Sequence, residues 1–207
     1  MRFHKPVSLK PLPYPDTFLE PFLSKRTLNE HHGHHQKAYV ADWNRISTLL
    51  ETQRNRAEGD KGSMIRALYE TQAFNGSGII LHEMYWENLA PFKRSIAPSP
   101  EIIQCMTRCF GSARRCLVDM VDVGTNIKGS GWVVLAWVPR FDRMMILPIN
   151  QHQNNWIPGA IPLIVIDVWE HAYYLEVGSG RNTYLSMIMN HLNWVTINKR
   201  FEDARTS

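Results

Sequence analysis

The chain has 207 residues, a formal net charge of +4 and a sequence isoelectric point near 9.0. Its hydrophobic content of 44% and aromatic content of 11% exclude an intrinsically disordered chain and are typical of a globular protein. No apolar run approaches the roughly 20 residues of a membrane-spanning helix, and the first residues contain no apolar signal-peptide core. We therefore expect an intracellular protein with no membrane span.

The positive charges are spread over several short groups, among them Arg114-Arg115 and Arg140 to Arg143. A solvated surface is the simplest explanation for them. Attraction of a small anion, or contact with the phosphates of RNA in a larger assembly, would need the same sign of charge. Net charge alone does not distinguish these three explanations.

At the N-terminus, the prolines of residues 1–24 exclude a regular helix and indicate an extended arm. A helix is predicted from Ser24, a suitable N-cap residue, to about Glu51. The charged segment from Arg54 to Gly62 should form the tip of a helical hairpin. The return helix should run from Met64 to Leu89, with Asn75-Gly76-Ser77-Gly78 interrupting it.

The prolines between Pro91 and Pro100 mark a domain boundary. One helix is predicted from Ile102 to Val121, and one or two helices from Arg181 to about Arg200. Segments rich in aliphatic and aromatic residues predict three strands: Trp132 to Val138, Met144 to Ile149 and Leu163 to Ile166. The predicted fold class is α+β: an N-terminal arm and long helical hairpin (1–92), then a C-terminal α/β domain (93–207) with a three-stranded antiparallel sheet.

The three cysteines, Cys105, Cys109 and Cys116, fall on the predicted helix after the boundary. An odd number on one helix is unsuited to a disulfide framework and favours a reducing, intracellular compartment. Buried free thiols are the simpler interpretation, with a metal or redox role as the alternative.

Asp167 and His171 lie four residues apart, directly after the apolar run from Ile161 to Ile166. A strand that ends at Asp167 can direct both side chains to one point. Further histidines lie upstream, at His31, His32, His34, His35 and His82. Three imidazoles and one carboxylate suit a first-row metal such as Mn, Fe or Zn. Taken alone, His31 and His35 are more often a structural or surface pair, and His82 a core residue.

The segment Asp167-Val168-Trp169-Glu170-His171-Ala172-Tyr173-Tyr174 resembles the signature of the iron/manganese superoxide dismutases. Other blocks resemble landmarks of that family in the same order and spacing: Leu12-Pro13-Tyr14 with Leu19-Glu20-Pro21, His31 to Tyr39, Phe74 to Gly78 with His82, Tyr85 and Trp86, Gly129 to Trp132, and Asn193-Trp194. The likeness extends over most of the chain.

The resemblance implies one Mn or Fe ion per chain, held between the two halves by four ligands: His31, His82, Asp167 and His171. It implies that Tyr39 flanks the substrate channel and that His35 lies beside it, one layer outside the ligands. Trp86, Trp132 and Trp169 would form the apolar wall that keeps the site dry.

In the family, one glutamine hydrogen-bonds the solvent at the metal, and its place in the chain differs between the two metal types. The iron-type position, four residues before the second ligand histidine, is Gly78 here. The manganese-type position is in the loop before the last strand, where we expect Gln151 rather than Gln153. Manganese is therefore favoured over iron.

The family pattern also implies a two-fold assembly. Glu170 would reach the ligand histidine of a partner subunit, with Tyr174 crossing nearby, and Arg181 would attract the anionic substrate. We expect a homodimer, or a heterodimer with a related chain.

Two functions follow from the resemblance. The first is dismutation of superoxide to oxygen and hydrogen peroxide. The second is a dismutase-like structural subunit of a mitochondrial ribosome or respiratory complex, which the basic charge and departures such as Leu81 and Val134 would suit. The complete ligand set favours the enzyme. The mitochondrial matrix is favoured over a bacterial cytoplasm.

Overall fold

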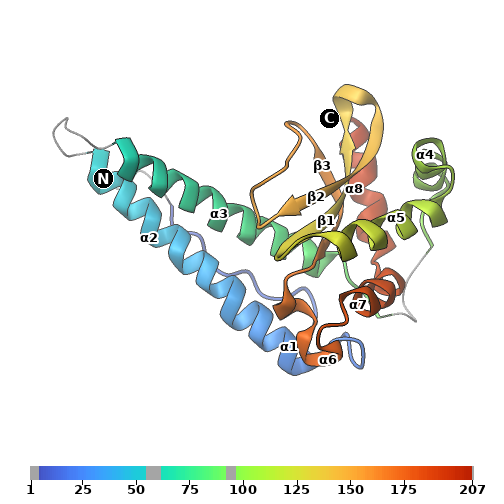
Figure 1. Ribbon diagram of the computed structural model, residues 1–207, viewed down its shortest axis with the longest axis horizontal. Coiled ribbons are helices and arrows are strands. Elements are labelled where there is room, and N and C mark those ends of the chain that lie inside the picture. The colour runs from blue at the N-terminus through green and yellow to red at the C-terminus, as the bar shows by residue number, and fades with distance from the viewer. Residues whose placement is uncertain (1–4, 55–61, 92–96, 207) are drawn as a thin grey trace.

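The computed structural model describes residues 5–54, 62–91 and 97–206 (Figure 1). The expected hairpin tip and the expected division at residues 92 and 93 lie outside these residues. The N-terminal arm has no regular helix, as the prolines predict, and it runs along the hairpin. Val7 and Asn44 join arm and helix through two hydrogen bonds of 2.9 and 2.8 Å.

The first arm of the hairpin is one helical rod with a local change of pitch. It consists of α1 (Lys25–Glu30), the π-helical turn η1 (His31–Gln36) and α2 (Lys37–Arg54). Ser24 is the N-cap, as predicted, and its side chain accepts a hydrogen bond from the backbone N–H of Thr27. The π-helical turn was not predicted; such turns frequently occur at functional sites.

The return helix α3 (Gly62–Glu87) runs without a break, so the predicted interruption at Asn75–Gly78 is wrong. The glycines serve helix packing instead. A Cβ atom on Gly76 would lie 2.5 Å from the Trp43 ring of α2, and one on Gly78 would lie 3.3 Å from both Tyr39 and His152. Close approach of α2 and α3 therefore needs glycine at position 76.

The predicted helix from Ile102 to Val121 is two helices, α4 (Pro100–Phe110) and α5 (Ala113–Asn126). Gly111 ends α4 in the left-handed conformation, with φ of 86°, and Ser112 caps α5 by accepting from the Arg115 N–H. The Gly-Ser pair is a helix stop followed by a helix start. The cysteines are free and lie on both helices.

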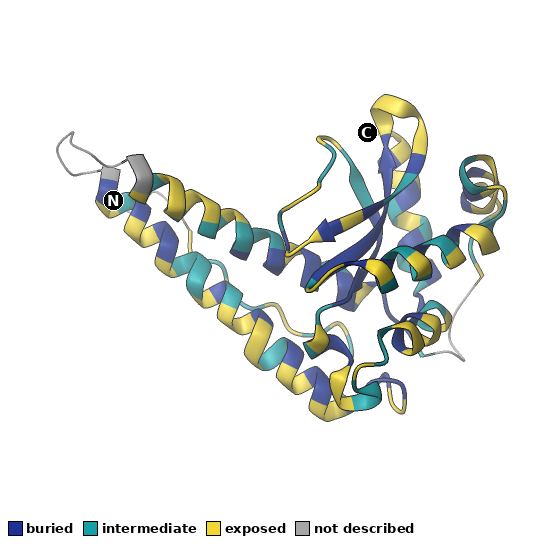
Figure 2. Ribbon diagram, viewed as in Figure 1, coloured by how far each residue is buried: buried dark blue, intermediate teal, exposed yellow. Residues whose placement is uncertain are grey.

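The three predicted strands are confirmed as β1 (Gly131–Val138), β2 (Arg143–Asn150) and β3 (Ile161–Asp167). They form an antiparallel sheet in the order β2-β1-β3. Every residue of the central strand β1 is buried. Figure 2 shows that burial concentrates in the sheet and on the hairpin faces turned toward it, so the sheet is the rigid centre of the C-terminal half.

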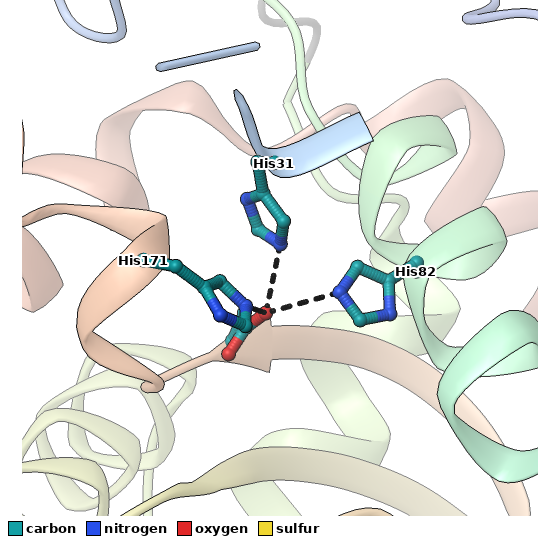
Figure 3. A group of neighbouring side chains, drawn as sticks. His31, His82 and His171 are labelled. Atoms are coloured by element: carbon teal, nitrogen blue, oxygen red, sulfur yellow. Dashed lines mark hydrogen bonds and ion pairs between the residues drawn. The ribbon is translucent and has the colours of Figure 1, made fainter. Parts of the chain in front are cut away.

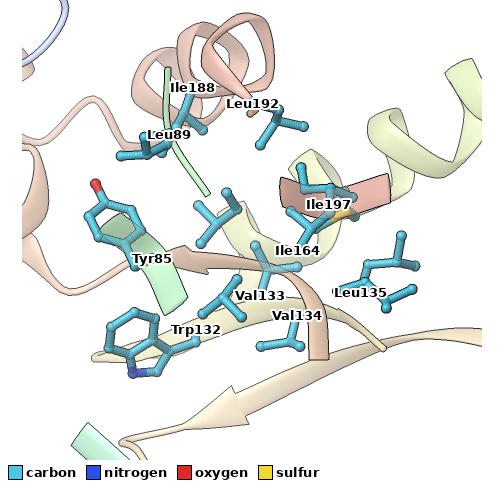
Figure 4. Packing of buried hydrophobic residues seen from close by; sticks show 14 of the residues in the cluster. Tyr85, Leu89, Trp132, Val133, Val134, Leu135, Ile164, Ile188, Leu192 and Ile197 are labelled. Carbon is cyan, nitrogen blue, oxygen red and sulfur yellow. The ribbon is translucent and has the colours of Figure 1, made fainter. Parts of the chain in front are cut away.

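After β3 come the 3₁₀ turn η4 (Glu170–Ala172), α6 (Tyr174–Val177), α7 (Arg181–Ile188), the 3₁₀ turn η5 (Met189–His191) and α8 (Trp194–Thr206). Helices α3 and α8 pack on β3, and α5 packs on β1 and β2. Side chains from α3, β1, β3, α7 and α8 meet in one apolar core (Figure 4).

The α+β fold class is confirmed: a helical hairpin followed by an α/β half with a three-stranded antiparallel sheet. The predicted C-terminal helices are α7 and α8, and α8 continues past Arg200. Within the described residues, no helix is long and apolar enough to cross a membrane.

Candidate metal centre

The four expected ligands come from separate elements that meet between the hairpin and the sheet. His31 opens η1, His82 lies in α3, Asp167 ends β3 and His171 lies in η4. The side chains of His31, His82 and Asp167 are fully buried, and that of His171 is 11% exposed. Their ligand atoms all lie within 4.8 Å of one another.

One carboxylate oxygen is the point on which the three imidazoles converge (Figure 3). Asp167 Oδ2 lies 3.0 Å from His31 Nε2, 3.2 Å from His171 Nε2 and 3.6 Å from His82 Nε2. The other oxygen, Oδ1, accepts a 2.8 Å hydrogen bond from the backbone N–H of Trp169. That bond fixes the carboxylate with Oδ2 facing the histidines.

The protonation states of these side chains are those that metal binding requires. Burial lowers the pKa of His31 to about 4 and that of His82 to about 3. Burial alone would raise the pKa of Asp167, but the adjoining His171 and His31 hold it well below its usual range. The site therefore contains neutral imidazoles around an ionised, buried carboxylate.

The tautomer of His82 also points to a cation. Its Nδ1 lies 2.5 Å from the carbonyl oxygen of Gly78, which can only accept, so the ring proton is on Nδ1. Nε2 then has a free lone pair, and it is buried with no hydrogen-bond partner among the described residues. A lone pair that faces a carboxylate oxygen at 3.6 Å fits a cation between them.

The donor set fits Mn or Fe. Three imidazole nitrogens and one carboxylate oxygen suit borderline first-row metals, whereas Mg²⁺ and Ca²⁺ prefer oxygen ligands alone. These four residues form the one such group of His, Cys, Asp and Glu side chains within the described part of the chain. The cysteines of α4 and α5 do not form a second group there.

Aromatic rings enclose the four side chains, as expected from the sequence. The Trp86 ring lies 4.7 Å from His31, Trp132 lies 4.9 Å from His82, and Trp169 stacks on His171 at 5.5 Å. Trp132 and Trp86 are 0% and 2% exposed, which leaves little room for bulk water on those sides.

Two further residues expected at the channel lie next to the ligands. The exposed ring of His35 stacks on His171 at 4.3 Å, and the Tyr39 ring lies 5.3 Å from His82. Burial, followed by the charge of Asp167, raises the pKa of Tyr39 above its usual range. The Tyr39 hydroxyl therefore keeps its proton at neutral pH.

The structure does not bring Gln151 to this site. Its backbone is in the left-handed region, with φ of 52°, and its exposed side chain accepts hydrogen bonds from Gln153 and Asn154. The next residue, His152, is fully buried instead. The backbone turn at Gln151 therefore directs the neighbouring imidazole into the protein.

Sequence reasoning missed His152 because it compared only glutamines in this loop. Trp132 Nε1 donates to His152 Nδ1 at 3.0 Å, so the ring proton is on Nε2, which is buried with no hydrogen-bond partner among the described residues. The ring lies 4.8 Å from Tyr39 and stacks on Trp169 at 4.8 Å. The signal available in the sequence was a histidine between the two glutamines; the backbone turn that selects it was not readable.

The remaining expected residues lie around this centre. Glu170 and Tyr174 are exposed. The Arg181 guanidinium donates to the carbonyls of Ile127 and Gly129 and to the Tyr173 hydroxyl, at 2.6, 2.8 and 3.1 Å. Arg181 therefore holds the loop that leads into β1.

The buried histidines predict the pH dependence of stability in the metal-free protein. The pKa values of His31 and His82 are lowered to about 4 and about 3 from 6.5, so the unfolded chain binds protons first as the pH falls. Stability should be complete above pH 6.5 and fall below it, by about 1.4 kcal/mol per pH unit for each histidine. Denaturant unfolding of the chelator-treated protein measures this. His34→Gln, at an exposed position of the same helical turn, should keep the slope, and a flat profile between pH 6.5 and 4.5 would contradict the assignment.

Comparison with known proteins agrees with this geometry. Residues 6–90 match the family described as iron/manganese superoxide dismutases, alpha-hairpin domain, and residues 98–200 match the C-terminal domain of the same enzymes. The chain is 36% identical over 196 residues to a superoxide dismutase [Fe] of Methanothermobacter thermautotrophicus, which covers 94% of each chain. It is 36% identical over 202 residues to a superoxide dismutase [Mn/Fe] of Propionibacterium freudenreichii subsp. shermanii, covering 97% of this chain and 98% of the relative. It is 33% identical over 208 residues to a superoxide dismutase [Mn] of Chlamydia pneumoniae, covering 98% of each.

Nothing in these matches supports the alternative of a structural subunit of a ribosome or respiratory complex. The likeness spans both halves of the fold and every element that contributes to the metal centre. The chain belongs to the iron/manganese superoxide dismutase family of oxidoreductases.

Proposed function

We propose that the protein dismutes superoxide at a single Mn or Fe ion bound by His31, His82, Asp167 and His171. The observation that carries the proposal is the convergence of three imidazole nitrogens on Asp167 Oδ2 inside an aromatic enclosure. The chemistry that a bound Mn or Fe supplies is one-electron exchange between its +3 and +2 states, by which one superoxide is oxidised to oxygen and the next is reduced to hydrogen peroxide. The chain's part is to hold the ion, exclude bulk water and supply protons.

Two side chains can supply protons beside the ligands. The reduction of superoxide to hydrogen peroxide consumes two protons. Tyr39 keeps its hydroxyl proton because burial raises its pKa. His152 carries a proton on Nε2, since its Nδ1 accepts from Trp132 and burial lowers its pKa to about 3, which keeps the ring neutral. We assign to His152 the hydrogen-bonding role expected of Gln151.

Manganese remains the favoured metal, and the packing at Gly78 supports this choice. A Cβ atom there would already lie 3.3 Å from Tyr39 and from His152, so the iron-type glutamine has no space at this position. Arg181 contributes a fixed positive charge, held by two backbone carbonyls, which would attract the superoxide anion. The mitochondrial matrix stays a prediction for the compartment.

The function is tested by loading the protein with Mn or Fe and measuring superoxide dismutation per bound metal. Asp167→Ala should bind less than a tenth as much metal and lose activity in proportion, because it removes the one anionic ligand. His34→Gln should bind and turn over as the unchanged chain does. Unchanged protein that holds one metal per chain and leaves superoxide decay at the uncatalysed rate would contradict the proposal.

The role of His152 is tested by comparing three variants of one loop. His152→Leu should retain the metal, shift its absorption spectrum and lower kcat by roughly 10- to 100-fold, because the buried N–H donor is lost. His152→Gln, which keeps a donor, should recover part of the rate. Gln151→Leu and Gln153→Leu alter exposed or half-buried side chains and should have little effect. A large loss in Gln151→Leu with none in His152→Leu would overturn the assignment.

We also propose a two-fold dimer in which Glu170 binds the His171 of the second subunit. The support is the exposure of Glu170 next to a ligand, and that of Tyr174, which is 54% exposed on the same short segment. Such an isologous contact would orient each ligand through the other subunit's carboxylate.

For this dimer, Glu170→Ala should raise the dissociation constant, measured by sedimentation, and speed metal loss together. Glu202→Ala removes an exposed carboxylate of α8 and is the matched control. An unchanged chain that sediments as a metal-loaded monomer at micromolar concentration would refute the proposal.

A further inference from the structure

The carboxylate of Glu176 lies on the N-terminus of α1, 152 positions earlier in the chain. Its Oε1 accepts from the Ser24 backbone N–H at 2.9 Å, from the Ser24 hydroxyl at 2.7 Å and from the Thr27 hydroxyl at 2.8 Å. Its Oε2 lies 2.8 Å from the same Thr27 hydroxyl. Thr27 is 1% exposed, so the cluster is shielded from water on the helix side.

These bonds complete a capping box that the sequence of α1 lacks. In a capping box, the N-cap side chain accepts from the N–H three residues later, and a Glu or Gln at that position accepts from the N-cap N–H. Ser24 performs the first part, with a 3.2 Å bond from the Thr27 N–H. The first turn of α1 has no acidic residue, and Glu176 performs the second part from α6.

The two ends of this contact are joined to different metal ligands. The α1 helix leads directly into His31, and Glu176 follows His171 by five residues. The α1 helix also packs against η4, which contains His171. His31 and His171 must keep their positions on either side of Asp167 Oδ2, at 3.0 and 3.2 Å, and they come from opposite halves of the fold.

We infer that Glu176 is a positioning residue for the metal centre: it fixes α1 to α6 and thereby holds His31 in register with His171. The inference rests on the metal site proposed above. Glu176 contacts neither the ligands nor the substrate channel in the contacts described, so its effect acts through the helix that carries His31. Its loss should therefore weaken metal retention more than it weakens the fold.

The test separates this role from ordinary helix capping. Glu176→Ala removes both the cap and the link between the halves. Adding Ser24→Asp to Glu176→Ala restores a strong N-cap within α1 but not the link. For each variant, the metal-free protein gives the unfolding temperature, and the Mn-loaded protein gives the rate of metal loss to a chelator well below that temperature.

We expect Glu176→Ala to release metal roughly 10-fold faster than the unchanged chain, the usual size of an outer-layer effect. The double variant should recover the unfolding temperature and still release metal fast, with altered visible absorption of the oxidised metal. Glu176→Gln, which keeps one acceptor oxygen, should be intermediate, and Glu202→Ala should match the unchanged chain. Hydrogen exchange of the His31–Gln36 amides in the metal-free protein should follow the release rates.

Two results would overturn the inference. One is release from Glu176→Ala at the unchanged rate, and the other is a double variant that recovers metal retention together with the unfolding temperature. The measurement is independent of the proposed function, because loaded protein without dismutase activity would refute that function while the release and exchange rates still decide the role of Glu176.

Discussion

The ionised carboxylate of Asp167, fully buried among neutral imidazoles, is the interaction on which the rest of this structure depends. An isolated charge in the interior is strongly unfavourable unless it is paired or coordinates a metal. Only two features offset it within the chain: the Trp169 N–H on Oδ1 and the histidine ring nitrogens around Oδ2. A cation at the centre would supply the missing charge, and for this reason the metal belongs to the energetics of the fold as well as to the chemistry.

Because the ligands come from four elements, the fold must keep two halves in register. The sheet fixes Asp167, since β3 pairs along its length with the fully buried β1, and Trp132 of β1 lies opposite Asp167 in that pairing. The hairpin fixes His31 and His82 through the close packing of α2 and α3 at Gly76. The contact between Glu176 and Ser24 then joins the hairpin to the segment that carries His171.

Most of the fold could be predicted from the sequence because its signals are local: apolar runs for the strands, Ser24 as a helix start, prolines in the arm. The four ligand positions were expected because their motifs resemble those of a known family. Glycine was misread in both directions, since Gly76 allows close helix packing inside α3 whereas Gly111 ends α4 in a left-handed turn. His152 and Glu176 were missed because one depends on the backbone turn at Gln151 and the other on a contact between distant segments. Neither leaves a local pattern.

The most direct test of the metal centre is a crystal structure of the Mn-loaded protein with anomalous scattering recorded at the manganese edge. The account predicts one strong anomalous peak per chain, bonded to Nε2 of His31, His82 and His171 and to Oδ2 of Asp167. His152 Nε2 should face the open side of the metal, and Gln151 should remain on the surface. A peak at another group of residues, or no peak from protein shown to contain manganese, would contradict it.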